Sequence, residues 1–238
     1  MIGICGGPSS GKSSVANVIK DQIPDAAILN LIHFYRPVRG NLRRRSRADS
    51  MVEEEKNTEE IKSEIREVYK QSDFDTPEAI DWELLNRCVK TLKNGKPFNM
   101  PIYDDEMMVR TAETEHIKPA QVIIVEGHLI FCNDEFMKQM DLKVFIDTDD
   151  DVRLSRRVLK LTRKYPDDKT ILSDFLLKYE NFVKPSYEKF IEPTKKYADM
   201  ILPNYGFSTE DKLDIDHMHI PVIDLIINKV FKKDNLAK

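Results

Sequence analysis

Short apolar runs recur along this chain and alternate with segments of helical character. Five runs of aliphatic and β-branched residues are bounded by turns or polar residues: Met1–Cys5, Ala26–Leu29, Val122–Val125, Leu142–Ile146 and Asp199–Leu202. Near-continuous runs of this length are typical of strands covered on both faces, as in a parallel sheet. The pattern therefore predicts an α/β fold of three layers, with a parallel sheet of about five strands.

Helical segments separate these runs. Thr76 followed by Pro77 is a typical helix start, and Gly95 is a typical stop, so a helix is predicted between them. A second, strongly basic helix is predicted over residues 153–164. The alternation of strand and helix favours one α/β domain over residues 1–238.

One long polar segment interrupts this alternation. Residues 36–72 contain the basic cluster 43–47 and the acidic run 53–55, a composition expected of an inserted loop or a solvated helical segment. Apolar residues spaced every three or four positions predict a short helix near residues 58–70.

Composition limits the class of partner. The chain has 238 residues, 37 of them basic and 41 acidic, and its net charge of −4 favours neither nucleic acid nor an anionic membrane. We therefore expect a small-molecule partner, no nucleic acid and no membrane, while a homo-oligomer stays open. The three cysteines are widely spaced and are expected to be reduced, mostly buried thiols. The chain starts directly in a strand and has no apolar run near the roughly 20 residues of a membrane span, so we expect a cytoplasmic protein.

The segment after the first strand carries the clearest chemistry. Residues 6–13 match the phosphate-binding loop G-x-x-x-x-G-K-[ST] at every position: Gly6, Gly7, Pro8, Ser9, Ser10, Gly11, Lys12 and Ser13. Ser14 continues into a predicted helix, whose N-terminus favours anions. Lys12 can reach the β- and γ-phosphates, and the Ser13 hydroxyl suits a Mg²⁺ ion held between them. The sequence thus predicts ATP and Mg²⁺ as cofactors.

Together with the phosphate-binding loop, six further motifs occur in an order that resembles the uridine-cytidine kinases. The resemblance covers about residues 1–205 and includes these segments: 6–14, 33–36, 74–77, 101–104, 125–127, 147–159 and 182–199. These enzymes transfer the γ-phosphoryl group of ATP to the 5′-hydroxyl of uridine or cytidine. The resemblance implies a P-loop kinase of pyrimidine salvage with a lid at about residues 153–185.

The resemblance also implies residue roles. Glu126 would join Ser13 as a Mg²⁺ ligand, and Lys12, Arg157 and Lys160 would act on the transferred phosphoryl group. Tyr35, Phe74, Asp75, Tyr103 and Arg157 would bind the nucleoside: Phe74 would stack on the pyrimidine, Asp75 would accept hydrogen bonds from ribose hydroxyls and Tyr103 would line the base pocket. From the residues alone, Asp75 could instead cap a helix and the two aromatic side chains could be core residues.

Several positions depart from the family pattern. Ile32 occupies the position of the aspartate that serves as general base, and loss of such a base typically costs ~10² to 10⁴ in rate. On an extended segment the neighbouring His33 would point the other way. Asp105 and Met108 stand where the family reads the pyrimidine edge. Two alternatives therefore stay open: a kinase-like nucleotide-binding protein with a regulatory role, and a P-loop kinase for a different hydroxyl substrate.

Overall fold

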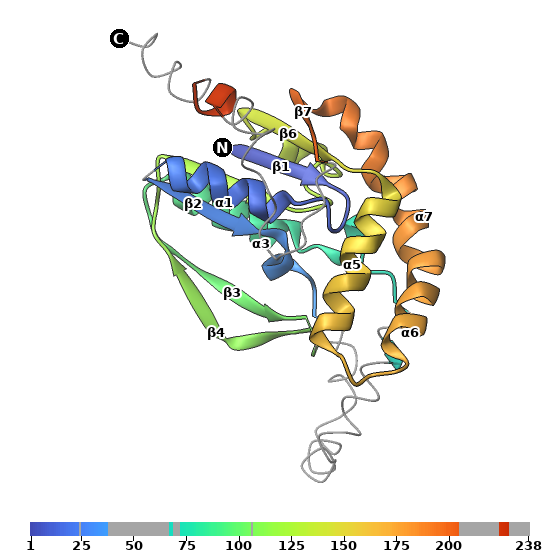
Figure 1. Ribbon diagram of the computed structural model, residues 1–238. Helices are drawn as coiled ribbons and strands as arrows, with labels where there is room; N and C mark the ends of the chain where they lie inside the picture. Colours follow the sequence, from blue (N-terminus) through green and yellow to red (C-terminus); the bar gives the residue numbers. More distant parts are fainter. Residues whose placement is uncertain (24, 38–66, 69–71, 106, 205–223, 229–238) are drawn as a thin grey trace, which may run out of the picture.

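A five-stranded parallel sheet forms the centre of the molecule. The computed structural model describes residues 1–23, 25–37, 67–68, 72–105, 107–204 and 224–228. The strand order is β2-β5-β1-β6-β7 (Figure 1). The strands span Ile2–Gly6 (β1), Ala26–Asn30 (β2), Val122–Glu126 (β5), Leu142–Asp147 (β6) and Met200–Pro203 (β7). All four pairings are parallel, and all five strands fall where the apolar runs predict them.

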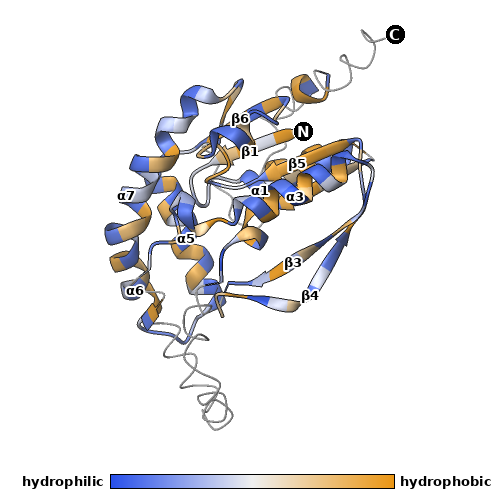
Figure 2. Cartoon of the chain, turned by 180° about the vertical axis from the view of Figure 1, so that it is seen from behind, coloured by the Kyte–Doolittle hydropathy of each residue, from blue (hydrophilic) through white to orange (hydrophobic). Residues whose placement is uncertain are grey.

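Helices cover both faces of this sheet, which confirms the three-layer α/β fold. On one face, Val15, Ala16 and Ile19 of α1 (Lys12–Gln22) pack with Ile4 and other residues of the central strands. The opposite face is covered by α3 (Trp82–Lys93), whose buried residues join a second cluster. The central sheet is accordingly mainly hydrophobic (Figure 2).

The helix predicted after Thr76 begins later than expected. Pro77–Ala79 forms only a short 3₁₀ turn, η5, and α3 begins at Trp82. The Asp81 side chain accepts a hydrogen bond from the Leu84 backbone N–H at 3.1 Å, so Asp81 is the cap of this helix. Gly95, at φ 71°, follows the end of α3 as predicted.

A two-stranded antiparallel hairpin was not predicted. It consists of β3 (Phe98–Asp104) and β4 (Val109–Ile117) and projects away from the central sheet (Figure 1). Most of β4 is exposed, so its sequence lacks the alternation of apolar and polar residues that marks a half-buried strand. The hairpin contacts the 3₁₀ turn η1 (Leu31–Phe34) and α3.

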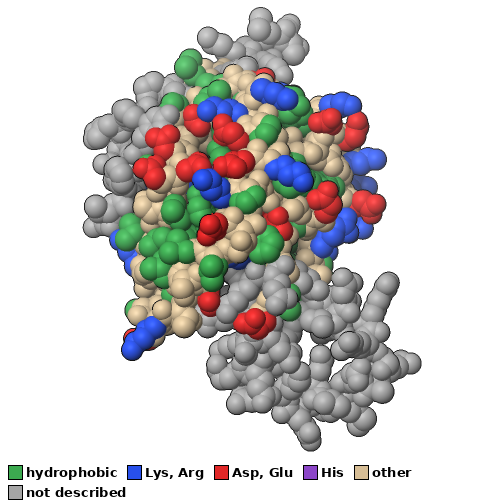
Figure 3. Space-filling view, turned by 90° about the vertical axis from the view of Figure 1, so that its right-hand side faces the viewer, with side chains coloured by type: hydrophobic (Ala, Val, Ile, Leu, Met, Phe, Trp, Pro, Cys, Tyr) green, Lys and Arg blue, Asp and Glu red, His purple; other side chains and the backbone are tan. Residues whose placement is uncertain are grey.

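The basic helix predicted at residues 153–164 is α5 (Asp150–Lys164). It packs against α6 (Ile171–Lys178), and the chain continues through several short helical segments to β7 (Figure 1). Further helical elements are α4 (Asp134–Met137), α6 (Ile171–Lys178), the π-helical η6 (Tyr179–Val183), α7 (Lys184–Ser186), the π-helical η7 (Tyr187–Ile191) and the 3₁₀ helix η8 (Glu192–Tyr197). Acidic and basic side chains are interspersed on this side of the molecule (Figure 3).

Three further sequence-based expectations concern the polar insertion, the cysteines and membrane-spanning helices. Most of the 36–72 insertion, with its expected short helix, lies outside the described residues. Cys5 and Cys88 are buried and Cys132 is partly buried, and all three are free thiols, as expected. Within the described residues, no helix combines the length and apolar character that a membrane crossing needs.

Candidate functional site

The phosphate-binding loop joins the end of β1 to the start of α1. Gly6 and Gly11 have φ angles of 146° and 99°, which residues with a Cβ rarely adopt. The Lys12 ammonium group donates a hydrogen bond to the Gly7 carbonyl at 2.8 Å. Burial lowers the pKa of Lys12, while the neighbouring Glu126 opposes that shift. A cationic side chain and a helix N-terminus thus meet at one loop, which is the arrangement that binds a polyphosphate.

Side chains from other segments of the chain make hydrogen bonds and packing contacts with this loop. The Ser10 carbonyl accepts hydrogen bonds from Thr148 Oγ1 at 3.2 Å and from Asn204 Nδ2 at 2.7 Å. The buried Arg153 guanidinium lies against Gly7, where a Cβ atom would come within 2.4 Å of Arg153 Nη1. The same guanidinium stacks on the Tyr187 ring at 3.8 Å. The loop conformation therefore depends on contacts with α5 and with the ends of β6 and β7.

Ser13 and Glu126 meet beside the loop. The Ser13 hydroxyl donates to Glu126 Oε1 at 2.8 Å, and Asn30 Nδ2 donates to the same oxygen at 2.6 Å. Glu126 is buried at the carboxyl end of β5. Such an oxygen pair fits Mg²⁺, which usually takes one or two protein ligands and completes its shell with phosphates and water. Within the described chain, no group of three or more His, Cys, Asp or Glu side chains forms a self-sufficient metal site.

Three aromatic side chains predicted to bind the acceptor come together. The Tyr35 ring centroid lies 5.8 Å from that of Tyr103 and 6.5 Å from that of Phe74. Burial raises the pKa of Tyr103 to about 12, and its buried hydroxyl has no hydrogen-bond partner among the described residues. A buried hydroxyl without a partner is costly, so this group is available to a ligand.

Asp75 pairs with a residue that the sequence interpretation missed. Its Oδ1 lies 2.9 Å from Nε2 of His128, and that nitrogen is 3.2 Å from the Tyr35 hydroxyl. Burial alone would raise the pKa of Asp75, but the hydrogen bond from His128 and the charges of Lys178 and Arg157 outweigh it, so the pKa is lowered. The carboxylate therefore contacts His128, and Thr76 is the N-cap of the turn that follows.

Lys178 is a second residue missing from the predicted site. It is buried in α6, donates a hydrogen bond to the Ser72 carbonyl at 3.2 Å and lies 4.4 Å above the centroid of Phe74. Burial lowers its pKa to about 7, although Asp75 and Asp73 act in the opposite direction. The sequence did contain a signal for this burial, because Lys178 follows Phe175 by three residues and therefore lies on the same, buried side of α6.

The two cations predicted for the lid, Arg157 and Lys160, differ in their surroundings. The Arg157 guanidinium carbon lies 6.0 Å from the centroid of Phe175, and its charge reaches Asp75. Lys160, one helical turn further along α5, is exposed. The structure thus brings Arg157, but not Lys160, into electrostatic contact with the acceptor side.

Ile32 and His33 lie in the 3₁₀ turn η1, so the expectation of an extended segment there was wrong. Ile32 is partly buried against the core. His33 Nδ1 accepts the Tyr103 backbone N–H at 3.4 Å, which places the ring proton of the neutral imidazole on Nε2. Burial lowers the pKa of His33, with Glu115 and Glu126 opposing. Neither residue offers an open lone pair that could replace a carboxylate base.

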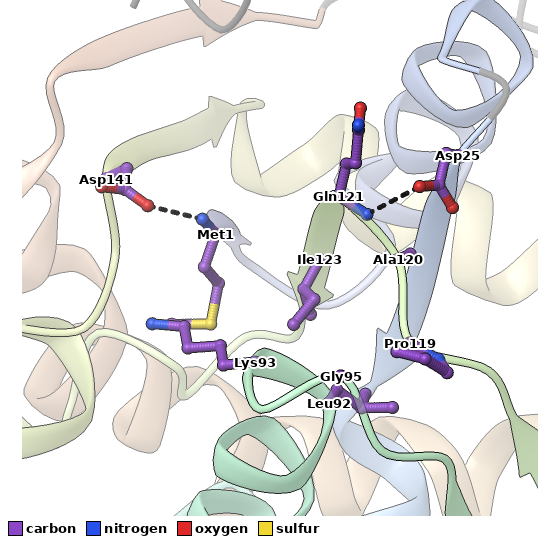
Figure 4. Close-up of a pocket in the computed structure, with 10 residues that line it drawn as sticks. All are labelled: Met1, Asp25, Leu92, Lys93, Gly95, Pro119, Ala120, Gln121, Ile123 and Asp141. Atoms are coloured by element: carbon purple, nitrogen blue, oxygen red, sulfur yellow. Dashed lines mark hydrogen bonds and ion pairs between the residues drawn. The ribbon is translucent and has the colours of Figure 1, made fainter. Parts of the chain in front are cut away.

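A separate cavity of about 500 Å³ lies at the opposite edge of the sheet. Figure 4 shows it beside Met1 and Gln121, which precede β1 and β5. Its acidic residues are already engaged: Asp141 binds the Met1 amino group at 2.6 Å, and Asp25 accepts the Gln121 N–H at 3.0 Å. Since ligands of open α/β sheets bind at the carboxyl ends of strands, this cavity is distinct from the phosphate site.

The parallel sheet with a phosphate-binding loop after its first strand defines the class of P-loop nucleotide-binding proteins. A family model described as "Phosphoribulokinase / Uridine kinase family" matches residues 1–209, and this chain belongs to that family. The chain is 35% identical to uridine-cytidine kinase B of Dictyostelium discoideum over 100% of this chain and 85% of that protein. It is 32% identical to a uridine kinase of Limosilactobacillus reuteri over 96% of this chain and 93% of that one.

The fold has solved counterparts. Phosphoribulokinase from Rhodobacter spheroides superposes with a TM-score of 0.55 at 15% sequence identity, over 89% of this chain and 72% of that chain. At this identity the likeness concerns the fold alone. The family membership makes the protein a kinase-type phosphotransferase.

Proposed function

We propose that this kinase transfers the γ-phosphoryl group of ATP to the 5′-hydroxyl of a pyrimidine nucleoside, uridine or cytidine. The observation that carries the proposal is the meeting of two half-sites at one sheet edge. The loop with Lys12, Ser13 and Glu126 supports the donor half, and the cluster of Tyr35, Phe74 and Asp75 supports the acceptor half. The uridine kinase names of the relatives support the same substrate class.

Each residue role follows from the chemistry of its side chain. Lys12 and the loop amides hold the triphosphate, and Ser13 and Glu126 hold the Mg²⁺ ion, which neutralises phosphate charge when bound. Asp75 accepts hydrogen bonds from ribose hydroxyls, the Tyr103 hydroxyl faces the base, and Phe74 stacks on it. Arg157, with Lys160 moving in from the exposed side of α5, balances the charge of the transferred group.

A missing carboxylate base at Ile32 is compatible with turnover. Phosphoryl transfer passes through a loose transition state, in which positioning and charge neutralisation contribute most of the catalysis. A base at this position typically contributes ~10² to 10⁴ in rate, so we expect a slow kinase.

The test is phosphorylation of a nucleoside panel by the purified protein with Mg·ATP, with nucleoside 5′-monophosphate and ADP both quantified. We expect product on uridine or cytidine, and a loss of about 10² or more in kcat for Lys12→Ala. Lys20→Ala, an exposed lysine on the same helix, is the matched control and should retain full activity. Product on a different hydroxyl compound alone, or ADP formation without any phosphorylated acceptor, would contradict the proposal.

A further inference from the structure

His128 joins three segments on the acceptor side of the site. It lies two residues after Glu126, and its Nε2 is 2.9 Å from Asp75 Oδ1 and 3.2 Å from Tyr35 Oη. The imidazole stacks on the Tyr35 ring with centroids 6.4 Å apart. Its backbone carbonyl accepts a hydrogen bond from the Cys5 thiol at 3.3 Å. The position of the imidazole is thus fixed by the hydrogen bond to its backbone carbonyl and by stacking on one face of the ring.

The proton on this ring can be assigned from its partner. An ionised carboxylate can only accept hydrogen bonds, so Nε2 must carry the proton that lies between His128 and Asp75. The same N–H is shared with the Tyr35 hydroxyl oxygen, which lies further away and accepts the weaker part of a bifurcated hydrogen bond. His128 is therefore a hydrogen-bond donor to Asp75.

Other cations compete for the same carboxylate. Lys178 and Arg157 both act on Asp75 through their charge. A carboxylate in partly buried surroundings is drawn strongly toward nearby cations, because the effective dielectric constant there is low. The backbone N–H of Asp75 is held by Asp73 Oδ1 at 2.9 Å, and Asp73 in turn accepts from Ser186. The hydrogen bond from His128 is a direct side-chain contact to the Asp75 carboxylate, whereas Lys178 and Arg157 act on it through their charge.

We propose that His128 is a positioning residue that orients Asp75 toward the ribose and thereby determines the preference for ribose over 2′-deoxyribose. This inference rests on the proposed function, in which Asp75 binds ribose hydroxyls. His128 fixes the orientation of the Asp75 carboxylate. The lone pairs of the carboxylate that His128 does not use then point in one direction, where they can accept hydrogen bonds from two neighbouring ribose hydroxyls together. Without His128, the carboxylate turns toward Lys178 and the two-hydroxyl geometry is lost.

The first test compares steady-state kinetics of His128→Leu and His128→Gln with the wild-type protein, using uridine and 2′-deoxyuridine. For His128→Leu we expect the KM for uridine to rise about tenfold or more, with kcat changed less than about threefold. The KM for 2′-deoxyuridine should change much less, so the preference for ribose falls. His128→Gln keeps an N–H donor and should restore part of that preference.

Two controls separate positioning from general damage. His116→Leu removes an exposed histidine of β4, which hydrogen-bonds Asn99, and should leave all constants unchanged. The KM for Mg·ATP should also stay constant in the His128 variants. Equal changes for the two nucleosides, or a parallel rise in the KM for Mg·ATP, would overturn the proposal.

A second measurement does not depend on turnover. Nitrogen-15 NMR of the imidazole should show the proton on Nε2 of His128, protected from exchange, and this protection should be lost in Asp75→Ala. A proton on Nδ1, or no response to Asp75→Ala, overturns the positioning role whatever the substrate. If the NMR result agrees and no nucleoside is phosphorylated, the proposed function fails and the ribose preference falls with it.

Discussion

Lys178 is an ionisable side chain buried on the apolar side of α6, between Phe74 and the carboxylates of Asp73 and Asp75. Its pKa falls from 10.5 to about 7, chiefly because burial disfavours the charged form. Between pH 7 and 10.5 the unfolded chain therefore holds more protons at this residue than the folded chain does. The free energy of unfolding must rise with pH over this window, and the contribution is flat below pH 7.

Replacing this lysine should remove that pH dependence. Relative to the wild-type protein, Lys178→Met should be more stable near pH 6 to 7, by up to a few kcal/mol. The difference should shrink as the pH approaches 10, because the wild-type lysine then loses its proton in the unfolded state as well. Denaturant unfolding from pH 6 to 10 measures both proteins. Parallel curves would show that the Lys178 ammonium is not destabilised by its surroundings.

At the same scale, the predicted donor residues share one local motif, whereas the contacts around Asp75 come from distant parts of the chain. Lys12 and Ser13 lie within one eight-residue motif, whose spacing itself encodes the chemistry. His128 and Lys178 reach Asp75 from 53 and 103 positions away in the chain, as their residue numbers show. No local pattern marks such contacts, because a lone histidine or lysine acquires its partner only when the sheet and α6 are assembled.

Among the elements, the turn η1 connects Asn30, which contacts the predicted Mg²⁺ ligand Glu126, to Tyr35, a predicted nucleoside-binding residue. Asn30, at the end of β2, donates to Glu126 at 2.6 Å and accepts the Ile32 N–H at 2.9 Å, so one amide orients the carboxylate and starts the turn. The close packing of η1 against the end of β5 also depends on Gly127. A Cβ atom there would lie 2.3 Å from Leu31 Cβ, which is buried and cannot move without its backbone.

Gly127→Ala should therefore displace η1 from the end of β5. We expect a loss of about 1 to 3 kcal/mol in the free energy of unfolding, as is typical of overpacking, measured by denaturant titration. The matched control is Gly3→Ala, where the nearest atom is the sulfur of Met140, which belongs to a flexible side chain. Equal losses in the two variants would mean that the contact between Gly127 and η1 is not rigid.

Elements could be predicted from the sequence where their burial is one-sided or complete. The five central strands were found because they are covered on both faces and read as apolar runs. The β3–β4 hairpin was missed since its outer strand, β4, is largely exposed and polar, and β4 pairs with β3 and not with the central sheet. The start of α3 was misplaced because Thr76 and Pro77 begin a 3₁₀ turn, while Asp81 makes the cap.

In the whole molecule, the residues of the candidate site lie together at the carboxyl ends of the parallel strands. The phosphate-binding loop follows β1, Asn30 ends β2 and Glu126 ends β5, while Asn204, which holds the loop, follows β7. A parallel sheet puts the carboxyl ends of its strands at one edge, so this gathering was predictable once the strand pattern was recognised. The helices α5 and α6, which lie in the predicted lid region, bring the charges of Arg157 and Lys178 to Asp75.

Because this edge links the loop to the core, nucleotide binding should stabilise the entire fold. At a hundredfold excess of Mg·ATP over its Kd, mass action adds about 2.7 kcal/mol to the free energy of unfolding, which corresponds to roughly 5 to 10 °C in Tm for a chain of this size. Lys12→Ala should lose most of this shift, since the buried ammonium group lies at the loop itself. Lys20→Ala, at the exposed end of α1, should keep it. Thermal unfolding with and without Mg·ATP measures all three proteins. A full shift in Lys12→Ala would show that the nucleotide binds somewhere other than this loop.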